Sequence, residues 1–165
     1  MPIYLAWADN SIKGDVSDQK YPGWIELNSF QWGVGRGITS PTGSESDREG
    51  STPSVSEIVV TKDQDSASPN LFRAACGTKP VNTGKTVHVA FAKTGTGGTS
   101  DTFLQFDLEN TLVSGWSISS SGDRPTESLT LNFTKVTMTN TPTGPTLTDE
   151  SPDRPHYDLA HQTGG

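Results

Sequence analysis

The chain has 165 residues, of which 12 are basic and 19 acidic, and its net charge is −7. This length predicts one domain with a single hydrophobic core. The basic side chains are scattered singly, so the acidic balance argues against binding to the phosphates of a nucleic acid. Hydrophobic residues make up only 30%, which indicates that part of the chain lies outside the core.

The cysteine content and the N-terminal sequence indicate the cellular compartment in which the protein folds. Cys76 is the one cysteine, so it cannot form an internal disulfide, and we expect folding in the cytoplasm. The N-terminal residues show neither a basic leader nor an apolar run of signal-peptide length. No stretch approaches the roughly 18 apolar residues of a membrane span. The sequence therefore predicts no signal peptide and no membrane insertion.

The first strands are predicted from alternating hydrophobicity. Residues 3–7 form a short strand with Ile3, Leu5 and Trp7 on one face. Residues 23–33 form the longest early strand, and both of its faces mix apolar and polar side chains. This pattern is typical of a strand that packs on the core of its own subunit with one face and on a neighbouring subunit with the other.

Residues 33–54 are rich in Gly, Ser and Thr and predict a long extended loop. A run of about twenty residues without regular structure is unusual inside a compact domain and is generally functional or disordered. Two interpretations stay open. The segment is either a surface excursion or an arm that becomes ordered on a neighbouring subunit.

One helix signal follows a buried strand at 55–61. Ser68 is a suitable N-cap, Pro69 fits the first helical position, and Gly77 ends the helix. The helix is short, so its stability must come from packing on a sheet. The predicted apolar face consists of Leu71, Phe72, Ala75 and Cys76.

Further strands are predicted at residues 86–93, 102–109, 111–119 and 127–138, with a bulge or bend near Thr134 and Lys135 in the last. Residues 139–165 lack a periodic apolar pattern and predict an extended C-terminal tail. Strands separated by turns, with one short helix, indicate a mainly β protein that is a barrel or a sandwich.

Motifs for chemistry are incomplete throughout the chain. Gly84-Lys85-Thr86 lacks the earlier glycine of a phosphate-binding loop and precedes a strand. The histidines have no metal-pair spacing and no cysteine near them. Cys76 falls in the last turn of the predicted helix, where the helix dipole does not activate a thiol. We therefore predict a protein that is not an enzyme and needs no cofactor and no metal.

Three segments resemble the Hcp family, the tube proteins of the bacterial type VI secretion system. The first is Lys13 to Asp15 with residues 22–33 (Pro-Gly-Trp-Ile-Glu-Leu-Asn-Ser-Phe-Gln-Trp-Gly), and the second surrounds the helix from Thr61-Lys62 to Leu71-Phe72. The third runs from Leu108 through Gly-Asp-Arg-Pro-Thr-Glu-Ser at 122–128 to Val136. Together they span about residues 1–140 in order.

The resemblance implies a small β-barrel of two antiparallel sheets over residues 1–138, with one short α-helix packed alongside and a tail at 139–165. It also implies a homohexameric ring that stacks into a tube, with a contractile sheath, the spike protein VgrG and small effector proteins in the lumen as partners. Assembly would take place in the bacterial cytoplasm, and sheath contraction would expel tube and cargo.

The sequence also offers candidate residues for the lumen and for subunit contacts. Ser117, Ser119, Thr130 and Asn132 are candidates for the lumen by strand phase. A phage-type tail tube protein and a carbohydrate-binding β-sandwich stay open as alternatives. The candidate subunit-contact residues are Trp32, Arg36, Ile38, Glu45, Arg48, Arg124 and Glu127.

Overall fold

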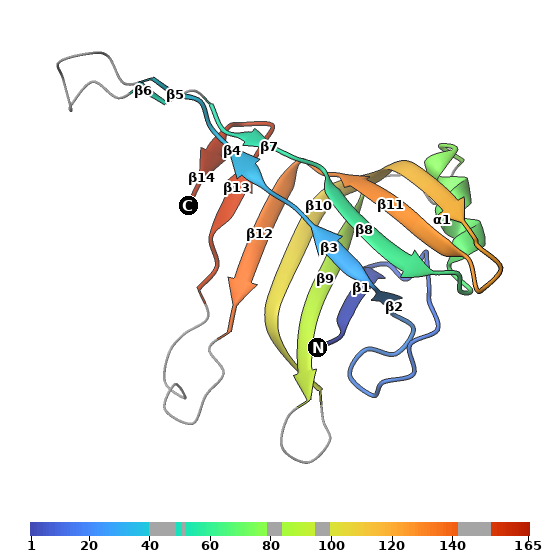
Figure 1. Ribbon diagram of the computed structural model, residues 1–165. Coiled ribbons are helices and arrows are strands. Elements are labelled where there is room, and N and C mark those ends of the chain that lie inside the picture. Colours follow the sequence, from blue (N-terminus) through green and yellow to red (C-terminus); the bar gives the residue numbers. More distant parts are fainter. Residues whose placement is uncertain (40–48, 51, 79–83, 95–99, 142–152) are drawn as a thin grey trace.

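The computed structural model describes residues 1–39, 49–50, 52–78, 84–94, 100–141 and 153–165 (Figure 1). The predicted class is confirmed, because the fold is mainly β, has two antiparallel sheets and carries one short helix, α1 (Ser68–Ala75). The strands are β1 Ile3–Trp7, β2 Ile25–Leu27, β3 Ser29–Gln31, β4 Val34–Gly35, β5 Ile38–Thr39, β6 Glu49–Gly50, β7 Ser54–Val55, β8 Ile58–Asp63, β9 Lys85–Thr94, β10 Ser100–Ser119, β11 Thr126–Asn132, β12 Lys135–Asn140, β13 His156–Asp158 and β14 Thr163–Gly164.

The two sheets share the long strand β10. Its first half pairs with β9 and β12, and its second half pairs with β11. We call the sheet β2-β1-β9-β10-β12-β13-β14 sheet A, and the sheet β3-β8-β11-β10 sheet B. Asn110 lies between the two halves with a positive φ of 52°, so β10 bends from one sheet into the other without ending. The predicted strands 102–109 and 111–119 are separated at the same residue.

The sheets meet a second time where β2 runs into β3. β2 pairs with β1 in sheet A, whereas β3 pairs with β8 in sheet B. The two strands are separated by Asn28, whose backbone N–H donates to the Thr61 carbonyl at 2.7 Å. The predicted continuous strand at 23–33 is therefore two short strands in different sheets. The described residues form no closed barrel, so the sheets enclose the core without a continuous cylinder.

The strand predicted at 127–138 is also two strands. β11 belongs to sheet B and β12 to sheet A, and the chain crosses between them at Phe133 and Thr134. The backbone N–H of Thr134 donates to the Glu109 carbonyl at 3.1 Å. The predicted bend near Thr134 is therefore confirmed as the point where the chain changes sheet.

The core lies between the two sheets. Leu5 and Trp7 are buried in it and Ile3 packs against it, which confirms the predicted face of the first strand. Tyr4, on the other face, belongs to a small second cluster that the loop before β2 covers; this cluster consists of Tyr4, Tyr21, Ala90 and Ala92. The loop therefore shields part of the outer surface of sheet A.

The helix α1 packs on the core through Leu71 and Ala74, which are 0% and 1% exposed. Gly77 follows its end with a φ of 75°, as predicted. Pro69 lies in the first turn, but as the second helical residue instead of the predicted first, because the helix begins at Ser68. The N-cap prediction was wrong, because Ala67 occupies that position without a side-chain bond. The predicted apolar face was wrong except for Leu71, since Phe72 is 51% exposed and Ala75 and Cys76 are also exposed.

The segment predicted as a loop at 33–54 forms a projecting two-stranded ribbon in its described part. β4 pairs with β7 and β5 pairs with β6, both antiparallel. In Figure 1 these strands lead away from the two sheets. We call residues 34–39, 49–50 and 52–55 the ribbon; residues 40–48 and 51 lie outside the described residues.

The described part of the predicted tail adds to sheet A. β13 pairs with β12, β14 pairs with β13, and Asn140 forms a bridge with Asp153. These residues are extended, as the sequence predicts, but they are hydrogen-bonded to the sheet. The division into a domain at 1–138 and a tail at 139–165 stays a prediction.

Replacement of Gly14 by alanine should destabilise the fold. A Cβ there would lie 2.5 Å from the Trp24 carbonyl oxygen and 2.8 Å from the Ile25 Cα, both backbone atoms. We expect a loss of about 1–3 kcal/mol in the free energy of unfolding, measured by denaturant titration. Gly33→Ala is the matched control, because a Cβ at Gly33 meets nothing within 4 Å. Equal stability of the two variants would contradict the packing argument.

Candidate functional site

A buried ion pair lies beneath the start of α1. Lys62 on β8 and Glu127 on β11 are partners across the strand pair, and both are 0% exposed. Their Nζ and Oε2 atoms are 2.7 Å apart. A charged pair this deep is stable only when its remaining hydrogen-bonding capacity is satisfied.

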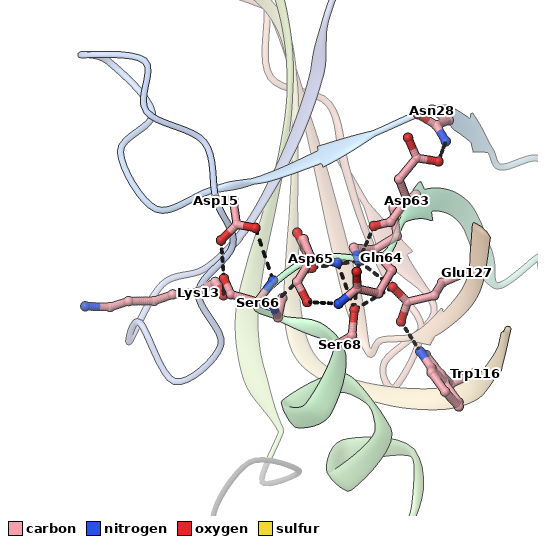
Figure 2. Close-up of polar contacts among 12 residues, drawn as sticks. Lys13, Asp15, Asn28, Asp63, Gln64, Asp65, Ser66, Ser68, Trp116 and Glu127 are labelled. Atoms are coloured by element: carbon pink, nitrogen blue, oxygen red, sulfur yellow. Dashed lines mark hydrogen bonds and ion pairs between the residues drawn. The ribbon is translucent and has the colours of Figure 1, made fainter. Parts of the chain in front are cut away.

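The surrounding groups supply those hydrogen bonds. Lys62 Nζ also donates to Asp65 Oδ1 and to the Asp63 carbonyl, both at 2.8 Å. Glu127 accepts from Ser68 Oγ at 2.6 Å and from Trp116 Nε1 at 2.7 Å. Figure 2 shows Ser68 and Trp116 pointing toward Glu127 from opposite sides. The cluster therefore joins the start of the helix to strands β8, β10 and β11.

Electrostatics keep Glu127 ionised. Burial by itself raises the pKa of this carboxyl, but the hydrogen bonds from Lys62, Ser68 and Trp116, with the charge of Lys62, lower the pKa below its ordinary value. A cluster that is buried and fully hydrogen-bonded has no free group for a substrate. Its role is to hold α1 against sheet B.

A second contact fixes the N-terminal loop to the same place. The Ser66 hydroxyl donates to Asp15 Oδ1, and the Ser66 backbone N–H donates to Asp15 Oδ2 at 3.2 Å (Figure 2). These hydrogen bonds lower the pKa of Asp15. A cleft of about 220 Å³ opens beside this contact; its charged lining residues are Asp15, Glu26, Asp63, Asp65 and Arg124.

The residues singled out as incomplete motifs have structural roles. Lys85 begins strand β9 instead of a helix, unlike the lysine of a phosphate-binding loop. His88 pairs with Asp107 on the neighbouring strand, with Nδ1 and Oδ1 2.5 Å apart. Within the described residues, no three His, Cys, Asp or Glu side chains are placed to hold a metal ion.

The outer face of sheet B is lined by small polar side chains. Ser29, Thr61, Ser128 and Ser117 are paired in register and form one continuous row across β3, β8, β11 and β10. The Ser29 and Thr61 hydroxyls are 2.5 Å apart. We call this surface the hydroxyl face; its other members are Gln31, Val59, Asp63, Thr126, Thr130, Asn132, Gly115, Ser119 and Leu112. All four predicted lumen candidates lie on it.

The outer surface of sheet A has a different chemistry. On the outward phase of its strands, Lys135 pairs with Glu109, and His88 lies beside Asp107. Part of it is covered by the N-terminal loop. Sheet A therefore presents a surface with salt bridges, which is typical of contact with solvent. The hydroxyl face differs, because its described residues form no ion pair.

The ribbon carries apolar side chains that the subunit does not cover. Val34 and Ile38 are each 54% exposed. Arg36, between them, is exposed and forms no ion pair with any described residue. A two-stranded ribbon is at best marginally stable in water unless it packs on something else. These residues therefore form the surface that most needs a partner.

The predicted subunit-contact residues are divided among these surfaces. Arg36 and Ile38 lie on the ribbon, and exposed Arg124 lines the acidic cleft. Trp32 packs inward on Phe106, with ring centroids 5.6 Å apart. Glu45 and Arg48 lie outside the described residues. Glu127 is placed differently from the prediction, because its buried carboxylate is used within the subunit.

Lys62 was not predicted as the partner of Glu127. The signal was present in the strand phase, since Ile58, Val60 and Lys62 alternate on the core face of β8. Glu127 precedes Leu129 and Leu131 in the same way on β11. Two opposite charges in the core phase of separate strands indicate a buried pair, but only the pairing of β8 with β11 brings them together.

No described helix is long and apolar enough to span a membrane.

Several solved structures similar to this chain are described as type VI secretion proteins. One described as a type six secretion system protein has 21% identity and a TM-score of 0.85, with 99% of each chain covered. Hcp1 from Salmonella typhimurium has 21% identity and a TM-score of 0.76 over 99% of this chain and 98% of its own. Secreted Hcp3 from Pseudomonas aeruginosa has 15% identity and a TM-score of 0.59 over 95% and 97%. The fold is the one that these secretion proteins share.

The sequence itself gives the family. The family model described as type VI secretion system effector, Hcp, matches residues 4–140, which is most of the chain. The chain belongs to the Hcp family, the tube proteins of the type VI secretion system. No curated protein sequence matches it significantly.

Proposed function

We propose that this protein is the structural subunit of a type VI secretion inner tube and has no catalytic activity of its own. Homohexameric rings assemble in the bacterial cytoplasm, stack inside a contractile sheath behind the spike protein VgrG, and are expelled with small effector proteins in the lumen. Family membership supports this proposal, and the exposed apolar ribbon is the structural observation that carries it.

The ribbon supports stacking because it leaves the subunit at one end. It precedes the start of β8 at Ile58, whereas the acidic cleft lies where β8 ends at Asp63. The subunit thus has unlike surfaces at its two ends, which favours head-to-tail contacts between copies. We propose that Val34 and Ile38 are buried on a subunit of the adjacent ring.

The hydroxyl face supports carriage of cargo. A ring has one surface toward the lumen and one toward the sheath, and the two outer surfaces of this subunit differ in chemistry. Short hydroxyl side chains such as Ser117, Ser128 and Thr61 give a smooth polar wall without ion pairs. We propose that the hydroxyl face is the wall of the lumen.

Native mass spectrometry of the full chain tests the ring. We expect the mass of six subunits, and rings with a central hole in negative-stain images. A monomer at all concentrations would contradict the proposal. A monomer that also binds glycans saturably would favour the carbohydrate-binding alternative, and a gene neighbourhood of capsid proteins would favour the phage tail tube.

A further inference from the structure

Glu57 is a fixed carboxylate at the edge of the hydroxyl face. Its Oε1 accepts from Asn132 Nδ2 and its Oε2 accepts from Ser114 Oγ, both at 3.0 Å. These two donors come from β11 and β10, so the carboxylate is held in place from two strands. The side chain is nevertheless exposed, and no described basic residue forms an ion pair with it.

The charged residues of the hydroxyl face and its edge are acidic, and Arg36 lies beyond this end on the ribbon, which leads away from the sheets (Figure 1). Asp63, the charged member of the hydroxyl face, lies at the opposite end of β8, about 20 Å from Glu57. Arg124 and the further carboxylates of the acidic cleft are at that distant end. Between them the row of Ser29, Thr61 and Ser128 is neutral. A charged partner of this face would therefore be basic.

A hollow beside Glu57 has the chemistry for such a partner. It has a volume of about 560 Å³ and is lined by Phe30, Gln31, Trp32, Ser56, Glu57 and Val59. Val59 and the two aromatic residues offer apolar surface, and the carboxylate lies among them. Lysine and arginine side chains combine an apolar stem with a cationic end, and they bury the first while pairing the second.

We infer that this hollow binds a lysine or arginine side chain of a cargo protein, so that the lumen wall selects cargo with a basic surface. The location in a lumen rests on the function proposed above. The lining residues of the hollow come from β3, β8 and the residues that adjoin these two strands. In a ring, every subunit would add one such carboxylate to the wall.

A pair of labelled peptides tests the inference. One short peptide alternates lysine and serine, and the other alternates glutamate and serine; binding to the full-length protein is measured by fluorescence anisotropy at low and high salt. We expect the lysine peptide to bind, less well at high salt, and the glutamate peptide not to bind. Glu57→Gln should weaken binding about three- to fivefold, and Glu57→Lys should abolish it.

Asp153→Asn is the matched control, because Asp153 is an exposed carboxylate beside sheet A without an ion pair among the described residues. It should bind the lysine peptide like the parent. Equal binding by Glu57→Gln and the parent, or equal weakening by Asp153→Asn, would overturn the inference. Native mass spectra of the same samples separate the two proposals. Monomers with Glu57-dependent binding would support the site and contradict the ring, whereas rings with Glu57-independent binding would contradict the site alone.

Discussion

Replacement of Lys62 by methionine will lower the free energy of unfolding by about 3–5 kcal/mol, because it leaves the carboxylate of Glu127 buried without its cation. The partner is close and shielded, with Nζ and Oε2 2.7 Å apart and both side chains 0% exposed. Ser68 and Trp116 still donate to Glu127, but neutral donors do not replace the charge. The measurement is denaturant unfolding followed by tryptophan fluorescence.

A double variant separates the pair from its individual charges. Lys62→Met with Glu127→Leu removes both buried charges together, and we expect it to recover most of the stability lost in the single variant. Glu109→Gln is the surface control, since its partner Lys135 is 3.6 Å away and both are partly exposed. A Lys62→Met protein as stable as the Glu109→Gln protein would contradict a structural role for the buried pair.

The cluster around Glu127 should make the stability of the protein depend on pH in the acidic range. The pKa of Glu127 is lowered in the folded protein, so its ionised form contributes stability that is fully present above the ordinary pKa of about 4.3. That contribution is lost as the pH falls through the lowered folded pKa. In Glu127→Gln this part of the pH dependence should be missing, as measured by unfolding at a series of pH values below neutrality.

Removal of residues 36–53, the part of the ribbon beyond the β4–β7 ladder, will prevent tube formation while the subunit stays folded. The variant joins Gly35 to Ser54 by Asn-Gly in place of residues 36–53. Gly35 and Ser54 are already paired in the β4–β7 ladder, and Asn-Gly is suited to a tight hairpin turn. The thermal midpoint should change little, because neither Val34 nor Ile38 is buried in the subunit. Tubes seen by negative stain in the parent should be absent.

A smaller change tests the apolar contact alone. Val34→Ser with Ile38→Ser should weaken each ring-to-ring contact about tenfold or more, from the burial lost by two half-exposed side chains. Leu112→Ser is the matched control, because Leu112 is 40% exposed but lies on the hydroxyl face, which is not the proposed ring-to-ring contact. Tubes formed equally by all three proteins would contradict the proposed role of the ribbon.

Much of the local structure could be predicted because it depends on short-range pattern. The alternation at residues 3–7 predicts β1 with its core face, and Pro69 and Gly77 mark the limits of α1. The absence of complete catalytic and metal motifs is also a property of the sequence. The fold class and the family resemblance follow from such patterns and are confirmed by the structure and the family match.

Tertiary contacts decided where strands divide and what the charges do. The alternation of side chains at 23–33 does not show that the chain changes sheet at Asn28. The change depends on the pairing partners, since β2 pairs with β1 and β3 pairs with β8. Composition indicates a loop at 33–54, but the ribbon depends on pairing between residues that are far apart along the chain, such as Val34 with Val55 and Ile38 with Gly50. The buried Lys62–Glu127 pair and the carboxylate of Glu57 arise in the same way. Each needs strands distant in the sequence to be adjacent, and only the packed sheet makes them neighbours.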